Sequence, residues 1–123
     1  MALEIRHKLK KKHGKIPFRR FRSGGYDHFN IQLFVEGDKE ELDRLDIVEY
    51  QLHSTFPKPL RRVRDRKRSF PLNIWTWGEF DIYVTFHFKD GSVRESVYSL
   101  EYSSELPSDD DAYIDVSPST LQG

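Results

Sequence analysis

The chain has 123 residues, which is enough for one domain built around one hydrophobic core. It contains no cysteine, which excludes disulfides, thiolate nucleophiles and cysteine-rich zinc sites and is typical of a reducing compartment. The mean hydropathy is −0.72, and no run approaches the roughly 20 apolar residues of a membrane span. Lysines near the start also interrupt the apolar stretch of a secretory signal. We therefore expect an intracellular, cytoplasmic protein that does not insert into membranes.

Charge is unevenly distributed, although 20 basic and 20 acidic residues cancel. Residues 1–22 carry nine Lys or Arg against one acid, residues 58–68 carry seven against one, and the last 23 residues carry six acids and no base. The two basic blocks and the acidic end of the chain are opposite in charge, so they can bind each other or each can bind a separate partner. The basic blocks are also candidates for phosphate contact, which makes nucleic acid an alternative partner, although a solvated surface is the simpler interpretation.

Taken in chain order, the predicted elements are mostly strands. Residues 3–9 alternate in polarity and predict an edge strand, on which lysines discourage pairing with another edge. Residues 29–35 alternate until Gly37-Asp38, and Asp38 can cap one short helical turn that ends near residue 45. Residues 47–53 predict the next strand.

The second half of the chain adds a hairpin. Residues 70–74 predict a short strand, and residues 80–88 show the cleanest period-two alternation in the sequence. Asp90-Gly91 predicts a tight turn into a partner strand over residues 92–102. Several short strands without long helices indicate an all-β fold, an immunoglobulin-like antiparallel β-sandwich.

Three segments are predicted along the chain. Residues 1–19 form a basic N-terminal segment with an edge strand, and residues 20–102 form the sandwich. Residues 103–123 form an acidic, flexible tail because they are rich in Ser, Pro and Asp, and their one apolar stretch, residues 112–116, is a candidate docking strand.

The chemistry is concentrated in two short segments, residues 50–59 (YQLHSTFPKP) and residues 75–80 (WTWGEF). His53 ends a strand on the face opposite Val48, Tyr50 and Leu52, so it is predicted to point away from the core. Thr55 and Phe56 follow in a loop fixed by two prolines. In a sandwich, loops that follow strands gather at the ends, which predicts that Phe56 and Trp77 lie close together. Gly78 would allow a close backbone approach or a positive φ.

Four motifs resemble the YEATS family, and most closely its prokaryotic branch. They are Gly25-Tyr26-Asp27-His28, residues 52–57 (LHSTFP), Phe70-Pro71-Leu72, and Trp77-Gly78-Glu79-Phe80. The order and spacing hold over residues 20–100, and the combination of LHxTFP with a later WGEF is more specific than either piece alone.

The resemblance implies a reader of acetyl-lysine, and preferably of crotonyl-lysine, on an acylated protein or peptide. Phe56 and Trp77 would be the aromatic walls that hold the planar acyl-amide between them. The Thr55 hydroxyl would bond to the ligand amide, and the backbone N–H of Trp77 to the acyl oxygen. The pocket would be completed by Tyr26, His53, Gly78 and Phe80, with His53 also orienting the Thr55 loop.

The residue types suit this chemistry. Acylation removes the lysine charge, so the side chain can enter a dry aromatic slot without desolvation of an ammonium. A flat amide stacked on an aromatic face gains about 0.5–1.5 kcal/mol beyond burial. An aromatic cage can instead hold methyl-lysine by cation–π attraction, but the Thr55 hydroxyl and the family pattern favour the acyl group.

The sequence departs from the family pattern at four positions. Thr76 stands where many members have glycine, Thr55 where eukaryotic readers have serine, and Trp77 where some members have tyrosine. Tyr26 adds a polar tip where phenylalanine is often found. These differences bear on the preferred acyl group more than on the fold.

Simpler interpretations compete for some of these side chains. Phe80 alternates with Ile82 and Val84, so pattern alone favours the core over the cage, and Trp75 is favoured as a packing residue. His53 serves equally well as an anchor for its loop. The five histidines show no metal-ligand spacing and no carboxylate is placed to orient His53, so we expect no metal, no cofactor and no enzymatic activity. The main alternative is an immunoglobulin-like interaction or scaffold module with another ligand, including other domains of a larger protein.

Overall fold

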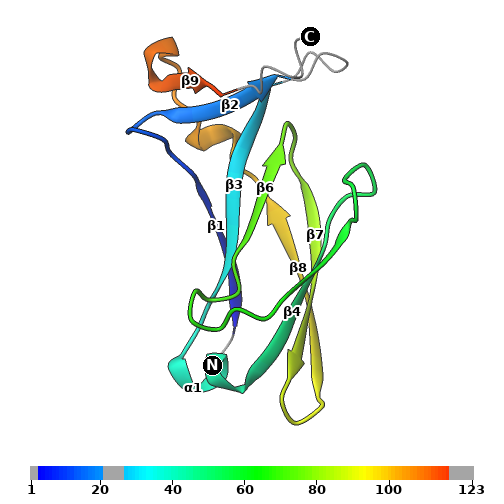
Figure 1. Ribbon diagram of the computed structural model, residues 1–123. Helices are drawn as coiled ribbons and strands as arrows, with labels where there is room; N and C mark the ends of the chain where they lie inside the picture. The colour runs from blue at the N-terminus through cyan, green and yellow to red at the C-terminus, as the bar shows by residue number, and fades with distance from the viewer. Residues whose placement is uncertain (1–2, 21–26, 117–123) are drawn as a thin grey trace. The chain divides into compact units, whose positions relative to one another are not determined.

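A computed structural model describes residues 3–20 and 27–116 (Figure 1). In this part of the chain the strands are β1 (Glu4–Leu9), β2 (Ile16–Arg20), β3 (Asp27–Glu36), β4 (Leu45–Gln51), β5 (Leu60–Val63), β6 (Leu72–Thr76), β7 (Phe80–Phe88), β8 (Val93–Leu100) and β9 (Tyr113–Asp115). The helical elements are α1 (Lys39–Arg44) and the 3-10 turns η1 (Ser103–Glu105) and η2 (Asp110–Ala112).

The strands form two sheets. One has the order β1-β3-β2-β9, with β6 also paired to β3, and the other has the order β5-β4-β7-β8. This architecture confirms the predicted immunoglobulin-like β-sandwich. The described residues divide into two compact units: unit 1 comprises residues 3–7, 33–72 and 80–100, and unit 2 comprises residues 8–20, 27–32, 73–79 and 101–116.

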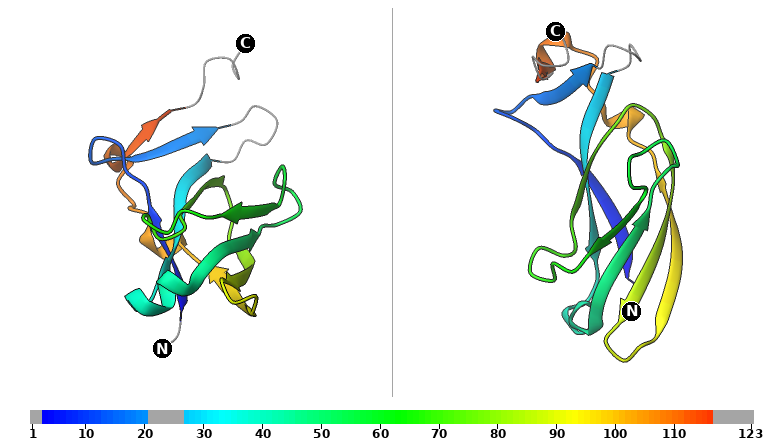
Figure 2. Two further views of the ribbon diagram at one scale, coloured as in Figure 1. Left: turned by 60° about the horizontal axis from the view of Figure 1, so that its bottom comes forward. Right: turned by 45° about the vertical axis from the view of Figure 1, so that its right-hand side comes forward.

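Unit 1 is organised around β4 and β7, which run side by side in Figure 2. Their inward side chains are almost completely buried because each strand alternates apolar and polar residues. The hairpin of β7 and β8 closes at Gly91, whose φ of +89° suits the tight turn predicted there. The buried side chains of these two strands are Leu45, Val48, Tyr50, Ile82, Val84, Phe86 and Phe88.

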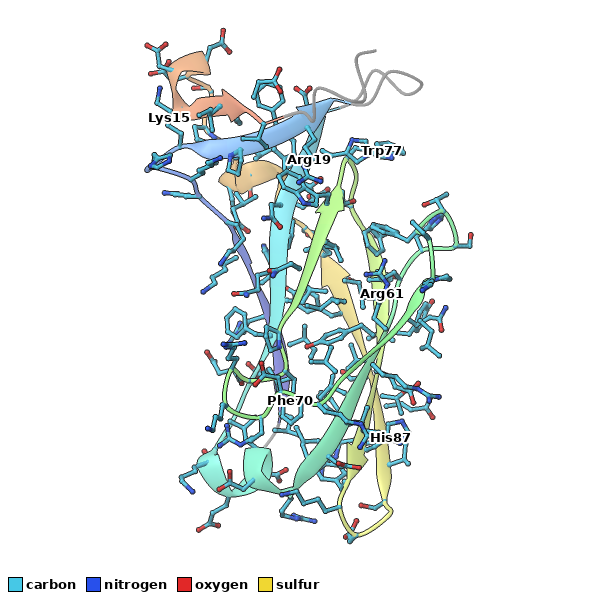
Figure 3. All side chains as sticks on the ribbon, in the orientation of Figure 1. Lys15, Arg19, Arg61, Phe70, Trp77 and His87 are labelled. Atoms are coloured by element: carbon cyan, nitrogen blue, oxygen red, sulfur yellow. The ribbon has the colours of Figure 1, made fainter. Side chains whose placement is uncertain are left out.

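A buried hydrogen bond ties β4 to the segment before β6. The Tyr50 hydroxyl donates to the Phe70 carbonyl at 2.7 Å, and burial raises the pKa of Tyr50. Phe70, labelled in Figure 3, is fully buried. Ser69 and Phe70 have φ values of +66° and +52°, so β6 begins at Leu72 rather than at residue 70 as the sequence predicts.

Three arginines of the second basic block, residues 58–68, pair with acids within unit 1. Arg62, Arg64 and Arg66 lie 3.4, 3.6 and 2.8 Å from Glu49, Asp46 and Asp43, respectively. Arg61 instead donates to the carbonyls of residues 57 and 58. Exposed pairs of this kind contribute little stability, but they reduce the positive potential that a phosphate backbone would meet.

Unit 2 contains β2, which the sequence does not predict, and the described part of the acidic segment. The chain enters β2 through a turn in which His13 and Gly14 both have positive φ, 54° and 77°. Residues 103–116, predicted to be flexible, form η1, η2 and β9. The predicted docking strand corresponds to β9, which pairs parallel to β2 in register Ile16↔Tyr113 (Figure 2).

Candidate functional site

One predicted binding segment is the loop over residues 53–56 in unit 1. The imidazole Nδ1 of His53 lies 2.9 Å from the Thr55 hydroxyl and accepts the Thr55 backbone N–H at 3.2 Å. The Phe56 N–H donates to the His53 carbonyl at 3.0 Å, which closes the turn. A neutral imidazole with its proton on Nε2 satisfies both contacts at Nδ1. The Thr55 hydroxyl then donates to His53, and its oxygen remains able to accept another hydrogen bond.

Two aromatic rings support this loop. The rings of Phe56 and Phe80 are 5.3 Å apart at an interplanar angle of 44°, and the rings of His53 and Phe80 are 6.3 Å apart, edge to face. Phe56 and Phe80 are half-buried, whereas His53 and Thr55 are exposed. Phe80 is the first residue of β7, so the sheet fixes its position, and its ring packs against that of Phe56.

The other predicted binding segment is the turn over residues 76–79 in unit 2. Trp77 is 55% exposed and stands at the tip of the turn that follows β6, as Figure 3 shows. Thr76 is buried, and its hydroxyl donates to the Gly78 carbonyl at 3.1 Å. Gly78 has no positive φ, and a Cβ added there would meet nothing within 4 Å. Neither structural reason expected for a glycine at position 78 therefore applies in this turn.

Glu79 anchors this turn to the chain that follows β8. Its carboxylate accepts the backbone N–H groups of Tyr102 and Ser103 at 2.7 and 2.9 Å. The bonds from Ser103 and Tyr102 lower the pKa of Glu79. The buried Tyr102 hydroxyl contacts the Thr76 carbonyl at 3.4 Å, and burial together with the Glu79 charge raises the pKa of Tyr102 to about 12.

The structure thus brings four of the predicted site residues together in unit 1: His53, Thr55, Phe56 and Phe80. Trp77 and Gly78 belong to unit 2, and Tyr26 lies outside the described residues. Sequence reasoning missed Glu79 and Tyr102 as supports. The acid directly after Trp77-Gly78 is the one signal that could have indicated Glu79. No group of three or more potential metal ligands occurs within residues 3–20 and 27–116, and these ranges hold no helix long and apolar enough to cross a membrane.

Comparison with solved structures defines the class of fold. The Yaf9 YEATS domain recognising a succinylated histone H3 peptide has a TM-score of 0.58 and 22% identity, with 85% of this chain and 78% of that chain covered. The Yaf9 YEATS domain bound to an acetylated histone H3 peptide has a TM-score of 0.54 at 22% identity, covering 81% and 73%. The fold is therefore that of a YEATS domain.

Sequence comparison defines the family. The family model of the prokaryotic YEATS domain matches residues 29–101, more than half of the chain, so the chain belongs to the prokaryotic YEATS domain family. Transcription initiation factor TFIID subunit 14 of Schizosaccharomyces pombe is 29% identical over 76 residues, which cover 61% of this chain. The match spans only 31% of the length of that protein.

Proposed function

We propose that this chain is a binding module for acylated lysine and holds the acyl-amide between Phe56 and Trp77. The main support is the hydrogen bond between His53 and Thr55 at 2.9 Å. It directs the Thr55 hydroxyl proton toward the imidazole, so the hydroxyl oxygen can accept the N–H of a ligand amide. An unmodified lysine ammonium also donates protons, but its charge would have to be desolvated against an aromatic ring.

The two aromatic walls are held in place by different contacts. Phe56 is braced by Phe80, which reduces the entropy lost when a ligand stacks on it. Trp77 presents an indole that is 55% exposed on a turn anchored by Thr76 and Glu79. Its backbone N–H would serve as the donor to the acyl oxygen, so the amide would be bonded at both ends.

The ligand preference follows from the shape of the acyl chain. A crotonyl group is planar and extends the stacked surface beyond the amide, so crotonyl-lysine should bind more tightly than acetyl-lysine. The solved Yaf9 YEATS domains, described with succinylated and acetylated histone H3 peptides, are consistent with an acylated protein or peptide as the partner class.

A peptide titration tests this function. Peptides carrying acetyl-, crotonyl- or unmodified lysine are titrated into the native chain and into Trp77→Ala and Phe56→Ala. Loss of an aromatic anchor should weaken acyl-peptide binding by about 30-fold or more. Tyr83→Ala is the matched control, because this tyrosine is 58% exposed on the four-stranded sheet. Equal binding of acylated and unmodified peptides would contradict the proposal and favour an interaction module with a different ligand.

A further inference from the structure

The two edges of the four-stranded sheet in unit 1 differ in their protection. One edge is β5, which has four residues, follows Pro57 and Pro59, and carries two arginines. The other edge is β8, which has eight residues with no proline and no lysine. Prolines, short length and basic side chains are the usual devices that stop an edge strand from pairing with another chain. β8 is long and contains no proline, Arg94 is its one basic residue, and β7 is its one partner among the described strands.

The charged side chains of β8 do not replace this protection. Arg94 stacks on the Phe88 ring at 5.0 Å and lies 3.8 Å from the Glu41 carboxylate. It therefore turns toward its own chain and leaves the strand edge open. Glu95 lies on the opposite, outer face, in register with Thr85.

An apolar row crosses the outer face and ends at β8. The strand register aligns Leu60, Gln51, Tyr83 and Val97 across all four strands. Leu60, Tyr83 and Val97 are 43%, 58% and 55% exposed, and the polar Gln51 interrupts the row between Leu60 and Tyr83. The row stops at the open edge, at Val97.

We propose that β8 pairs antiparallel with β8 of a second copy of this chain, about a two-fold axis at Val97. In this register Val97 faces its own copy, Glu95 faces Ser99, and the apolar row continues across eight strands. An axis at Glu95 would place two carboxylates opposite each other, which is destabilising, and an axis at Ser96 would place Glu95 against Val97. A single pair of strands buries little surface, so the dimer forms at high micromolar concentrations.

The absence of cysteine gives a direct test of the register. In Val97→Cys, the two new thiols of the dimer would face each other with Cβ atoms about 4.5–5.5 Å apart. A small shift of the strands brings them within the roughly 3.5–4.5 Å of a disulfide, so mild oxidation should link the dimer. Val93→Cys is the matched control, because Val93 lies on the same face of β8 and is 54% exposed. In the proposed register the two copies of residue 93 are separated by roughly 26 Å. Equal cross-linking of the two variants would overturn the proposal, because random collisions would explain it.

Sedimentation of the unmodified chain and of two lysine variants provides the second measurement. The native chain should shift from monomer to dimer between micromolar and millimolar concentrations. Val97→Lys sets two ammonium groups opposite each other and should remain monomeric, whereas Val93→Lys should still dimerise. A native chain that stays monomeric at millimolar concentration, or a Val97→Lys variant that dimerises like the native chain, would overturn the proposal. Peptide binding is not required in either measurement, so the result is independent of the acyl-lysine proposal.

Discussion

The 53–56 loop and the 76–79 turn are held in place by different kinds of contact. The loop is closed by hydrogen bonds among its own residues, and its base is fixed by the Leu52 N–H, which donates to the Pro59 carbonyl at 2.8 Å. The turn relies on Glu79, whose partners Tyr102 and Ser103 follow the β7–β8 hairpin in the sequence. The loop is therefore locally determined, whereas the turn takes its position from chain that is distant in sequence.

Among substitutions outside the two aromatic walls, the largest effect on binding is expected for Glu79→Gln. A neutral amide is a weaker acceptor for the N–H groups of Tyr102 and Ser103. The turn that carries Trp77 should loosen, and the affinity for an acylated peptide should fall about tenfold. Calorimetric titration measures the change. Glu101→Gln, beside Tyr102 on the exposed surface, should bind like the native chain, and an equal loss in both variants would contradict the anchoring role.

Lowering the pH should also weaken binding of the acylated peptide, but by less than Glu79→Gln does. Because the pKa of Glu79 lies below its ordinary value of 4.5, its carboxylate contributes fully above pH 4.5 and is lost as the pH falls through the lowered value. Affinity should therefore decrease a few-fold below pH 4.5, as partial protonation removes the charge. Glu79→Gln should show a flatter pH profile over the same interval. Parallel profiles in the two proteins would assign the effect to other groups.

His53→Ala tests the contribution of the locally determined 53–56 loop. Removal of the imidazole frees the Thr55 hydroxyl to rotate, and one exposed hydrogen bond contributes about 0.5–1 kcal/mol. The affinity for acylated peptide should fall roughly threefold, with no change in the unfolding temperature beyond that of a surface substitution. Thr55→Val removes the same bond together with the ligand contact, so it should lose more affinity. If His53→Ala weakens binding more than Thr55→Val, the histidine contacts the ligand itself.

Tyr50→Phe should leave binding unchanged while it destabilises the fold. The substitution leaves the buried Phe70 carbonyl without its 2.7 Å donor, at a cost of about 1–3 kcal/mol. Denaturant unfolding should show the loss, and peptide titration of the folded variant should match the native chain. Tyr83→Phe, on the exposed sheet face, is the control for stability. A change in affinity for Tyr50→Phe would mean that the core and the loop are coupled.

The comparison also explains which features could be predicted from the sequence. The strand pattern of β7, the turn at Gly91 and the exposed position of His53 follow from period-two alternation and turn chemistry, which act over a few residues. The left-handed backbone at Ser69 and Phe70 could not be predicted, because neither residue type favours positive φ and distant contacts impose it. The Glu79 anchor was missed for the same reason, since its partners lie beyond an intervening hairpin.

The parallel pairing of β2 with β9 has a consequence for the order of folding. These strands come from opposite ends of the described chain, so their contact closes a very long loop that carries a large entropic cost unless the intervening structure has already formed. β9 has only three residues, so its contacts with β2 offset little of that entropic cost. It should therefore dock late during folding and detach first in the native state. The amide of Val116, which donates to the Phe18 carbonyl, should exchange with solvent well before the amides of β4 and β7.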